Sequence, residues 1–411
     1  MRAYCCRACL WQTTRSMGCL TMFSDRTKWS LVPNRLSEAL ARHRAAGKRL
    51  VDLTASNPTE CGFAYDESAI LEALRNPAAL KYEPAPLGLA SARQAVCEYY
   101  AEHGAMPDID DILLTTSTSE AYSYVFRLLC NPRDEILIPA PSYPLFDFLA
   151  EIQDIKLVRY PLVYDHGWET DFHSLEQAIT PRTRAIVVVH PNNPTGHFTK
   201  RSEMQKLNVL CAARGLALLV DEVFLDSCLT PEPPSSFAGR RDALTFTLSG
   251  LSKICGLPQM KVAWLVTSGP EQPKREALER LEVIADTYLS LSAPVQLAMP
   301  AFLSQWRGFQ GQLMARVRRN LAGLDRQFAL QKACSRLQVE GGWYAVLRVP
   351  ATRSDEDHAL CLLNDLSVYV HPGHFYDFPS EGYLVVSLIS KEEEFSTGMK
   401  RILERFSVCA Q

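Results

Sequence analysis

Short apolar runs alternate with amphipathic stretches between residues 108 and 266. Most of the runs lack a polar–apolar alternation, which is the pattern of strands that are buried on both faces of a sheet. Stretches with helical periodicity, such as 117–129 and 200–214, separate them. This repeated strand–helix order predicts an α/β fold in which helices cover a mostly parallel sheet. The predicted strands are 112–114, 135–138, 185–189, 216–220, 244–248 and 262–266.

The chain has 411 residues, enough for two domains. A charged helical stretch at 269–287 leads into a second region with a different element order. There the pattern predicts helices at 309–330 and 391–406 and strands at 346–349, 369–371 and 383–388. We therefore predict an extension outside the core at 1–21, an arm that packs with the small domain at 22–55, a large domain at 56–290 and a small α/β domain at 291–411.

Composition and charge exclude several classes of protein. The formal net charge is −3, which gives no reason to expect a nucleic-acid or anionic-membrane partner. No apolar run approaches the roughly 20 residues that span a bilayer. The 13 cysteines are scattered without paired spacing, which favours a reducing compartment over a disulfide framework and predicts a cytoplasmic protein. No second ligand pair follows the cysteines at the start of the chain at zinc spacing, so we predict no metal site.

Residues 1–21 differ from the rest of the chain. They contain Arg2, Arg7 and Arg15, and the first acidic residue is Asp25. This bias is typical of an organellar transit peptide, but a long amphipathic pattern is lacking. We favour the other interpretation, an upstream extension of the reading frame with Met22 as the start.

Lys253 is the strongest candidate for chemistry. It lies among small residues and serines, in Leu-Ser-Gly-Leu-Ser-Lys at 248–253, where an amine can reach an aldehyde cofactor without side-chain clash. By itself such a lysine is more often an ordinary surface residue. Asp221 follows the buried run 216–220, and a carboxylate there is costly unless it meets a cation. A protonated pyridine nitrogen is such a cation, whereas a helix-capping aspartate is the structural alternative.

Three further motifs follow predicted strands. Asn193 lies in the tight loop His-Pro-Asn-Asn-Pro-Thr-Gly at 190–196, which as a bare turn is common. Ser117-x-x-Glu120 is a capping box, and the start of a helix can bind a phosphate, although most capped helices bind nothing. Tyr143 could stack on a flat cofactor or fill the core. In a parallel sheet these strand ends share one edge, where ligands bind.

In the order Tyr82, Ser117, Tyr143, Asn193, Asp221 and Lys253, these residues resemble the fold-type-I enzymes that use pyridoxal 5′-phosphate (PLP), and among them the class I and II aminotransferases. The resemblance extends from about residue 23 to the end of the chain. Its most specific parts are Asn-Asn-Pro-Thr-Gly at 192–196, Asp-Glu-Val-Phe at 221–224 and Ser-Gly-Leu-Ser-Lys at 249–253.

The resemblance implies a role for each matching residue. Lys253 would form the Schiff base with PLP and shuttle the substrate proton. Asp221 would pair with the pyridine nitrogen, Asn193 would bind the phenolic oxygen, and Tyr143 would stack on the ring. Further cofactor contacts are implied for Ser117, Thr118, Ser252 and Lys261, and substrate contacts for Ser56, Asn57 and Trp343. Tyr82 would reach the neighbouring site in a homodimer.

The chain departs from the family pattern at four positions. Phe224 stands where a tyrosine usually contacts the phenolic oxygen, and Gly250 where a serine is usual. Lys261 replaces a phosphate-binding arginine, which keeps the charge and loses the bidentate fork. Val385 replaces the arginine that grips the substrate α-carboxylate, and an apolar side chain cannot do so.

These observations predict a PLP-dependent aminotransferase that moves an amino group between an amino acid and a 2-oxo acid. One alternative is another PLP reaction on the same fold, a lyase, decarboxylase or oxidase, which Val385 favours somewhat. The other alternative is a protein that binds PLP without catalysis. Regulators of that kind carry an extra DNA-binding domain, for which the segment after Met22 is too short.

Overall fold

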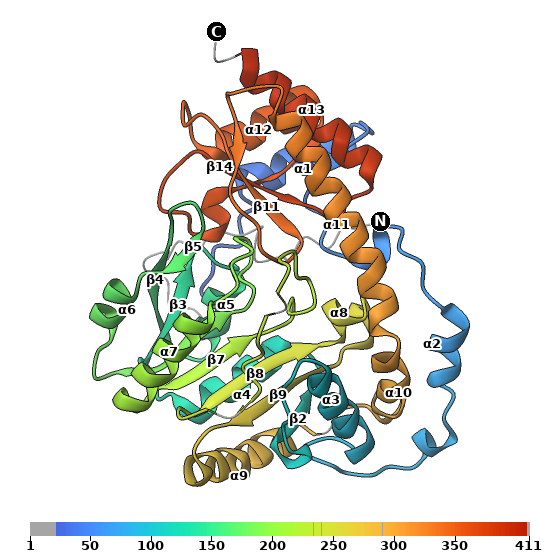
Figure 1. Cartoon of the computed structure of the whole chain (residues 1–411), viewed down its shortest axis with the longest axis vertical. Coiled ribbons are helices and arrows are strands. Elements are labelled where there is room, and N and C mark those ends of the chain that lie inside the picture. Colours follow the sequence, from blue (N-terminus) through green and yellow to red (C-terminus); the bar gives the residue numbers. More distant parts are fainter. Residues whose placement is uncertain (1–21, 233, 240, 290, 409–411) are drawn as a thin grey trace.

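The central feature of the computed structural model is an eight-stranded sheet in the lower half of Figure 1. The structure describes residues 22–408 except 233, 240 and 290, so the interpretation of residues 1–21 lies outside the described part. The strand order is β2-β9-β8-β7-β6-β3-β4-β5. The strands are β2 (Ile112–Thr115), β3 (Glu135–Ala140), β4 (Lys156–Tyr164), β5 (Trp168–Thr170), β6 (Thr183–Val189), β7 (Ala217–Asp221), β8 (Thr245–Gly250) and β9 (Ala263–Ser268).

The pairing of these strands confirms the predicted fold class. Neighbours from β8 through β7, β6 and β3 to β4 are parallel. β9 is antiparallel to both β2 and β8, and β5 is antiparallel to β4. The link from β8 to β9 contains only α8 (Leu251–Ile254) and a short 3-10 turn, too little for the crossover that a parallel pair requires.

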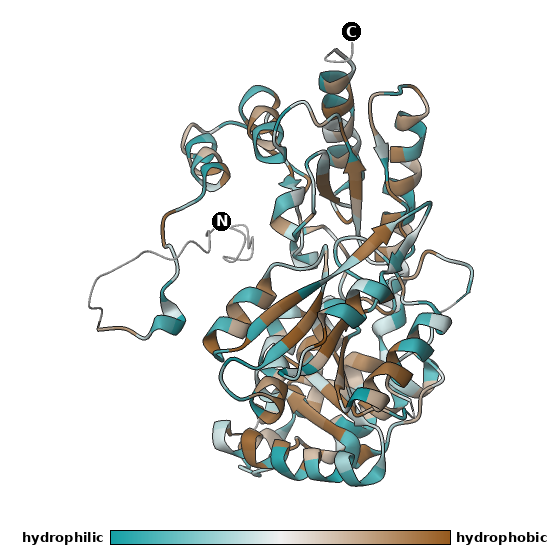
Figure 2. Ribbon diagram, turned by 90° about the vertical axis from the view of Figure 1, so that its left-hand side faces the viewer, coloured by the Kyte–Doolittle hydropathy of each residue, from teal (hydrophilic) through white to brown (hydrophobic). Residues whose placement is uncertain are grey.

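Both faces of the sheet are buried, which explains why the strands lack alternation. On β6 and β7, Val187 and Leu219 face one layer of helices, whereas Ile186 and Leu218 face the other. Figure 2 shows the central strands as predominantly hydrophobic and the outer helix faces as hydrophilic. The helices of this region are α2 (Glu67–Ala73), α3 (Ala90–Glu102), α4 (Thr118–Leu129), α5 (Leu145–Ile152), α6 (Phe172–Ala178), α7 (Arg201–Arg214), α9 (Glu271–Tyr288) and α10 (Ala293–Ser304).

The second region, in the upper half of Figure 1, contains a four-stranded antiparallel sheet in the order β10-β11-β14-β13. Its strands are β10 (Ser335–Arg336), β11 (Tyr344–Arg348), β13 (His371–Pro372) and β14 (Tyr383–Ser387). The helices α11 (Trp306–Phe328), α12 (Asp355–Leu366) and α13 (Glu392–Val408) pack around it. α11 runs along the side of the molecule and joins the two regions (Figure 1).

The N-terminal arm packs against this second region. β1 (Val51–Asp52) pairs in parallel with β12 (Val368–Tyr369). The arm helix α1 (Arg35–Ala45) lies beside α12, and Arg35 forms ion pairs of 3.0 and 2.9 Å with Glu356 and Asp357. The division of the chain at residue 290 stays a prediction. Because α10 shares a core with α3 and β9, we propose that the small domain begins after α10.

Within the described residues, no helix is both long enough and apolar enough to cross a membrane.

Candidate active site

A cavity of about 290 Å³ lies at the carboxyl ends of the parallel strands, between the two regions. Nine of the predicted site residues line it, and they come from segments far apart in the chain: Ser56, Ser117, Thr118, Tyr143, Asn193, Asp221, Phe224, Ser252 and Lys253. Ligands of open α/β sheets bind at this edge. Four other predicted residues, Asn57, Tyr82, Lys261 and Trp343, do not line the cavity.

Lys253 reaches into the cavity from α8, which begins directly after β8. Its Nζ lies 4.4 Å from the centroid of the Trp343 ring and donates a hydrogen bond of 3.5 Å to the carbonyl of Ser56. Burial lowers the pKa of the Lys253 amine to about 8, although the carboxylate of Asp221 acts in the opposite direction. A substantial fraction of this amine is therefore neutral near pH 8, as a nucleophile or a general base requires.

Asp221 ends β7, and hydrogen bonds fix its carboxylate. The backbone N–H of Val223 donates to Oδ1 at 3.1 Å, and the hydroxyl of Tyr122 donates to Oδ2 at 3.2 Å. Burial nevertheless raises the pKa of Asp221 to about 6. A cation in the cavity beside this carboxylate would remove much of the cost of its charge. Tyr122 was missed by the sequence interpretation, although it follows the Ser117-x-x-Glu120 motif on α4.

Asn193 carries a side-chain oxygen that is buried and has no hydrogen-bond partner within the described part of the chain. The loop around it is well ordered by its own bonds: the hydroxyl of Thr195 donates to Oδ1 of Asn192 at 2.9 Å, and the N–H of Gly196 donates to the carbonyl of Asn192 at 2.8 Å. A buried polar group without a partner is costly, so a polar ligand that satisfies the amide would bind favourably.

The start of α4 faces the cavity through Ser117, Thr118 and Ser119. The Oγ of Ser117 accepts from the N–H of Glu120 at 3.1 Å. The Glu120 carboxylate accepts in return from the N–H of Thr116 at 2.6 Å, one residue before the position that a standard capping box uses. Three hydroxyl groups and the positive end of a 12-residue helix thus border the cavity, which suits a bound anion.

Gly250 shows why the usual serine is absent. A Cβ at this position would lie 2.8 Å from the carbonyl oxygen of Val262 and 2.9 Å from the Cβ of Ala263. β8 and β9 therefore approach each other too closely for any side chain here.

The predicted residues outside the cavity have other surroundings. Trp343 is fully buried and packs edge-on against Phe224, with ring centroids 4.9 Å apart. Lys261 is exposed and has a left-handed backbone, with φ of 53°. Tyr82 is 76% exposed. The Asn57 side chain accepts from the N–H and hydroxyl of Thr59, at 3.2 and 2.8 Å, so it stabilises its own turn.

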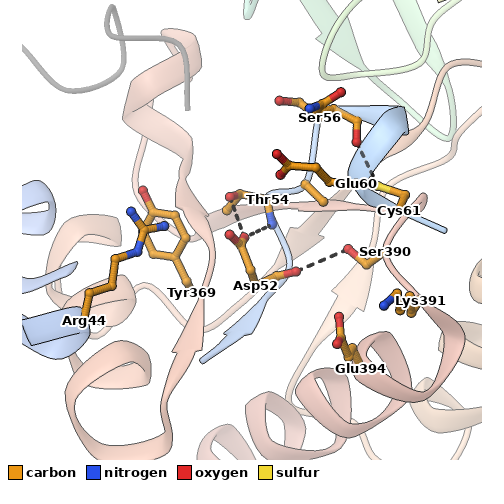
Figure 3. Close-up of a pocket in the computed structure, with 12 residues that line it drawn as sticks. Arg44, Asp52, Thr54, Ser56, Glu60, Cys61, Tyr369, Ser390, Lys391 and Glu394 are labelled. Atoms are coloured by element: carbon orange, nitrogen blue, oxygen red, sulfur yellow. Dashed lines mark hydrogen bonds between the residues drawn. The ribbon is translucent and has the colours of Figure 1, made fainter. Parts of the chain in front are cut away.

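A second, polar cavity of about 220 Å³ lies on the other side of the segment that carries Ser56 (Figure 3). Ser56 and Asn57 both line it, together with Asp52 and Lys391. The carboxylate of Asp52 points back to its own loop and accepts from the N–H and the hydroxyl of Thr54 at 2.8 and 2.7 Å (Figure 3). Ser56 is therefore placed at both cavities, and Asn57 only at this one.

Val385 lies on β14, where the family pattern carries an arginine, and is 1% exposed. It pairs with Val346 on one side and with His371 on the other. His371 and Tyr376 line the main cavity, and the sequence interpretation assigned neither of them a role in the site.

Comparisons with known proteins agree with this geometry. The family described as aminotransferase class I and II matches residues 50–402. The glutamate-pyruvate aminotransferase AlaA of Escherichia coli is 31% identical over 64% of this chain and 65% of its own length, so the matched part is just under two thirds of that relative. The alanine aminotransferase of Mycobacterium tuberculosis is 28% identical over 88% of this chain and 86% of its own.

A solved structure of an alanine aminotransferase from Pyrococcus furiosus has a TM-score of 0.85 at 22% identity and covers 93% of this chain and 99% of its own. This likeness supports the fold, and the family match covers most of the sequence. The chain therefore belongs to the family of class I and II aminotransferases.

Proposed function

We propose that this protein is a PLP-dependent aminotransferase that moves an amino group between an amino acid and a 2-oxo acid. The observation that carries the proposal is the meeting of Lys253, Asp221 and the start of α4 in one cavity. The names of the relatives further suggest alanine or glutamate as donor and pyruvate or 2-oxoglutarate as acceptor.

The residues of the cavity fit PLP in three respects. The buried carboxylate of Asp221 suits a protonated pyridine nitrogen, the unpaired amide oxygen of Asn193 shows that this side chain awaits a polar partner, and the start of α4 suits a phosphate. Ser117, Thr118 and Ser252 would hold the phosphate, and Tyr143 would stack on the ring. Bound PLP supplies an electron sink for the charge that develops on the substrate α-carbon.

Lys253 supplies the amine that would hold the aldehyde carbon of PLP and carry the proton of the substrate α-carbon. Its lowered pKa, about 8, matches that proton transfer to an ordinary working pH. Trp343 and Phe224 border Nζ and exclude water from it, with ring centroids at 4.4 and 5.7 Å. Phe224 has no hydroxyl, so we assign contact with the phenolic oxygen to Asn193.

The test is transfer between defined substrates. Purified protein loaded with PLP is incubated with L-alanine and 2-oxoglutarate, and both pyruvate and glutamate are measured. We expect the two products in equal amounts, with no reaction when either substrate is omitted. Pyruvate and ammonia without glutamate would favour another PLP reaction instead. Bound cofactor that turns over no amino acid of a broad panel would favour a protein that binds PLP without catalysis.

We also propose a homodimer in which Tyr82 acts at the site of the partner subunit. Tyr82 and its neighbour Leu80 are 76% and 93% exposed, and Tyr82 lies outside the cavity of its own chain. An exposed aromatic and apolar pair is typical of an interface.

Mixing two weak variants tests the shared site. Lys253→Ala and Tyr82→Ala are each expected to have little activity. In a mixed dimer, the site with an intact Lys253 receives an intact Tyr82 from the other subunit. We therefore expect activity to rise on mixing after subunit exchange, toward one wild-type site per mixed dimer. Activity equal to the average of the two variants, with dimers verified by light scattering, would contradict the shared site.

We place the protein in the cytoplasm, because the eight cysteines in the described ranges (22–408 without 233, 240 and 290) are all unpaired, as in a reducing compartment.

A further inference from the structure

Cationic side chains are scarce around the main cavity. Among its lining residues within the described chain, only Lys253 and His371 can carry a positive charge. An amino-acid substrate brings an α-carboxylate, and a buried carboxylate needs a cation or several hydrogen-bond donors. In the proposed function, Lys253 is already occupied with the amine chemistry. We propose that His371 and Tyr376 together bind the substrate carboxylate; this inference rests on the proposed function.

The two side chains form one unit. Nδ1 of His371 lies 2.9 Å from the hydroxyl of Tyr376, and both residues are buried, with 6% and 3% exposure. A neutral pair has two donor hydrogens, one N–H and one O–H, and its internal bond uses one of them. Protonation of the imidazole adds a third donor and a positive charge. In either state the pair offers donors to a carboxylate, as the apolar Val385 opposite His371 cannot.

The position of the pair is fixed before a ligand arrives. His371 is held in β13 by pairing with Val385, and the backbone carbonyl of Tyr376 accepts from the N–H of Ser142 at 2.9 Å. Ser142 precedes Tyr143, which lines the opposite region of the cavity. The contact thus joins the small domain to the loop of the large domain, and a preorganised pair loses little entropy on binding.

The nearest acidic residue in sequence does not compete for the pair. Asp377 follows Tyr376 directly, and its carboxylate forms an ion pair of 2.7 Å with Nε of Arg159. The same guanidinium binds Asp147 at 2.9 Å. The charge of Asp377 is therefore compensated at the surface, and an incoming carboxylate meets the imidazole and the phenol.

The test compares two substrates that differ only at the carboxylate. L-Alanine carries it, whereas L-alaninamide keeps a carbonyl beside the α-carbon and lacks the charge. For His371→Phe we expect kcat/KM for alanine to fall about 10- to 100-fold, the range for a hydrogen bond to a charged group, while the value for alaninamide changes less than about threefold. Tyr376→Phe, which keeps the ring, is expected to show the same selectivity with a smaller loss. Equal losses on both substrates would overturn the proposal in favour of a structural role.

A binding measurement separates this inference from the proposed function. Calorimetric titration of the PLP-loaded protein with propionate and with propionamide needs no turnover. We expect wild type to prefer propionate and His371→Phe to lose that preference, with a melting temperature close to that of wild type. This result would support the carboxylate site even if transamination failed. A wild-type protein that binds propionate no more tightly than propionamide would overturn the inference even if transamination succeeded.

Discussion

Replacing Lys253 with alanine is expected to lower kcat for amino transfer by at least about 10,000-fold, the upper range for loss of a general acid–base, since the same amine would also hold the cofactor. The change removes the cavity-lining amine with the lowered pKa, about 8, from a position between Trp343 and Asp221. Amino transfer in single-turnover and steady-state assays measures the loss.

The matched control is Lys400→Ala on α13, where the side chain is 74% exposed and pairs only with Glu404 across one turn of the helix. It is expected to retain full activity. The Lys253→Ala protein is expected to stay folded, because removing a desolvated amine relieves a cost of burial. A Lys253→Ala enzyme that retains more than about a hundredth of wild-type activity would contradict the assignment.

Asp221→Asn is expected to inactivate the enzyme and to stabilise the protein without cofactor. Loss of the negative charge beside the proposed pyridine nitrogen is expected to lower kcat/KM about 100- to 1,000-fold, as when one partner of a buried ion pair is removed. Asparagine has nearly the same shape as aspartate and can still accept from the N–H of Val223 or the hydroxyl of Tyr122. The cavity therefore keeps its form while its charge changes.

The effect of Asp221→Asn on stability depends on pH with a definite sign. The pKa of Asp221 in the folded protein, about 6, lies above the ordinary value of 3.8. Between these values the folded state binds more protons than the unfolded state, so wild-type stability without cofactor falls as pH rises from about 4 to about 6. Asp221→Asn removes this loss. Its free energy of unfolding is expected to match wild type near pH 4 and to exceed it by about 1–3 kcal/mol above pH 7.

Urea denaturation of both proteins without PLP, across this pH range, measures the difference. The exposed Asp365 on α12 provides the control, since its side chain is 56% exposed and Asp365→Asn should leave the pH profile unchanged. Addition of PLP is expected to raise the stability of wild type more than that of Asp221→Asn. A variant less stable than wild type at pH 8 without cofactor would contradict the burial of an uncompensated charge.

Local patterns in the sequence were sufficient for the fold class and for part of the site. The apolar runs around Val187 and Leu219 predict strands buried on both faces, because each strand must satisfy two layers of helices. Asp221 and Lys253 could be located because each directly follows such a strand, and parallel strands bring their ends to one edge. The match to the class I and II aminotransferases confirms the predicted family. The role of each residue stays a prediction.

Contacts between distant segments were decided only by the tertiary structure. Tyr122 meets Asp221 across 99 positions, and the side of α4 that it occupies carries no signal of that pairing. His371 comes to the cavity because β13 pairs with β14, two-residue pairing that no periodicity reveals. Asn57 and Trp343 were expected at the substrate, yet one stabilises its own turn and the other is buried under Lys253. Periodicity determines which face of an element is buried, and long-range packing determines which side chains meet there.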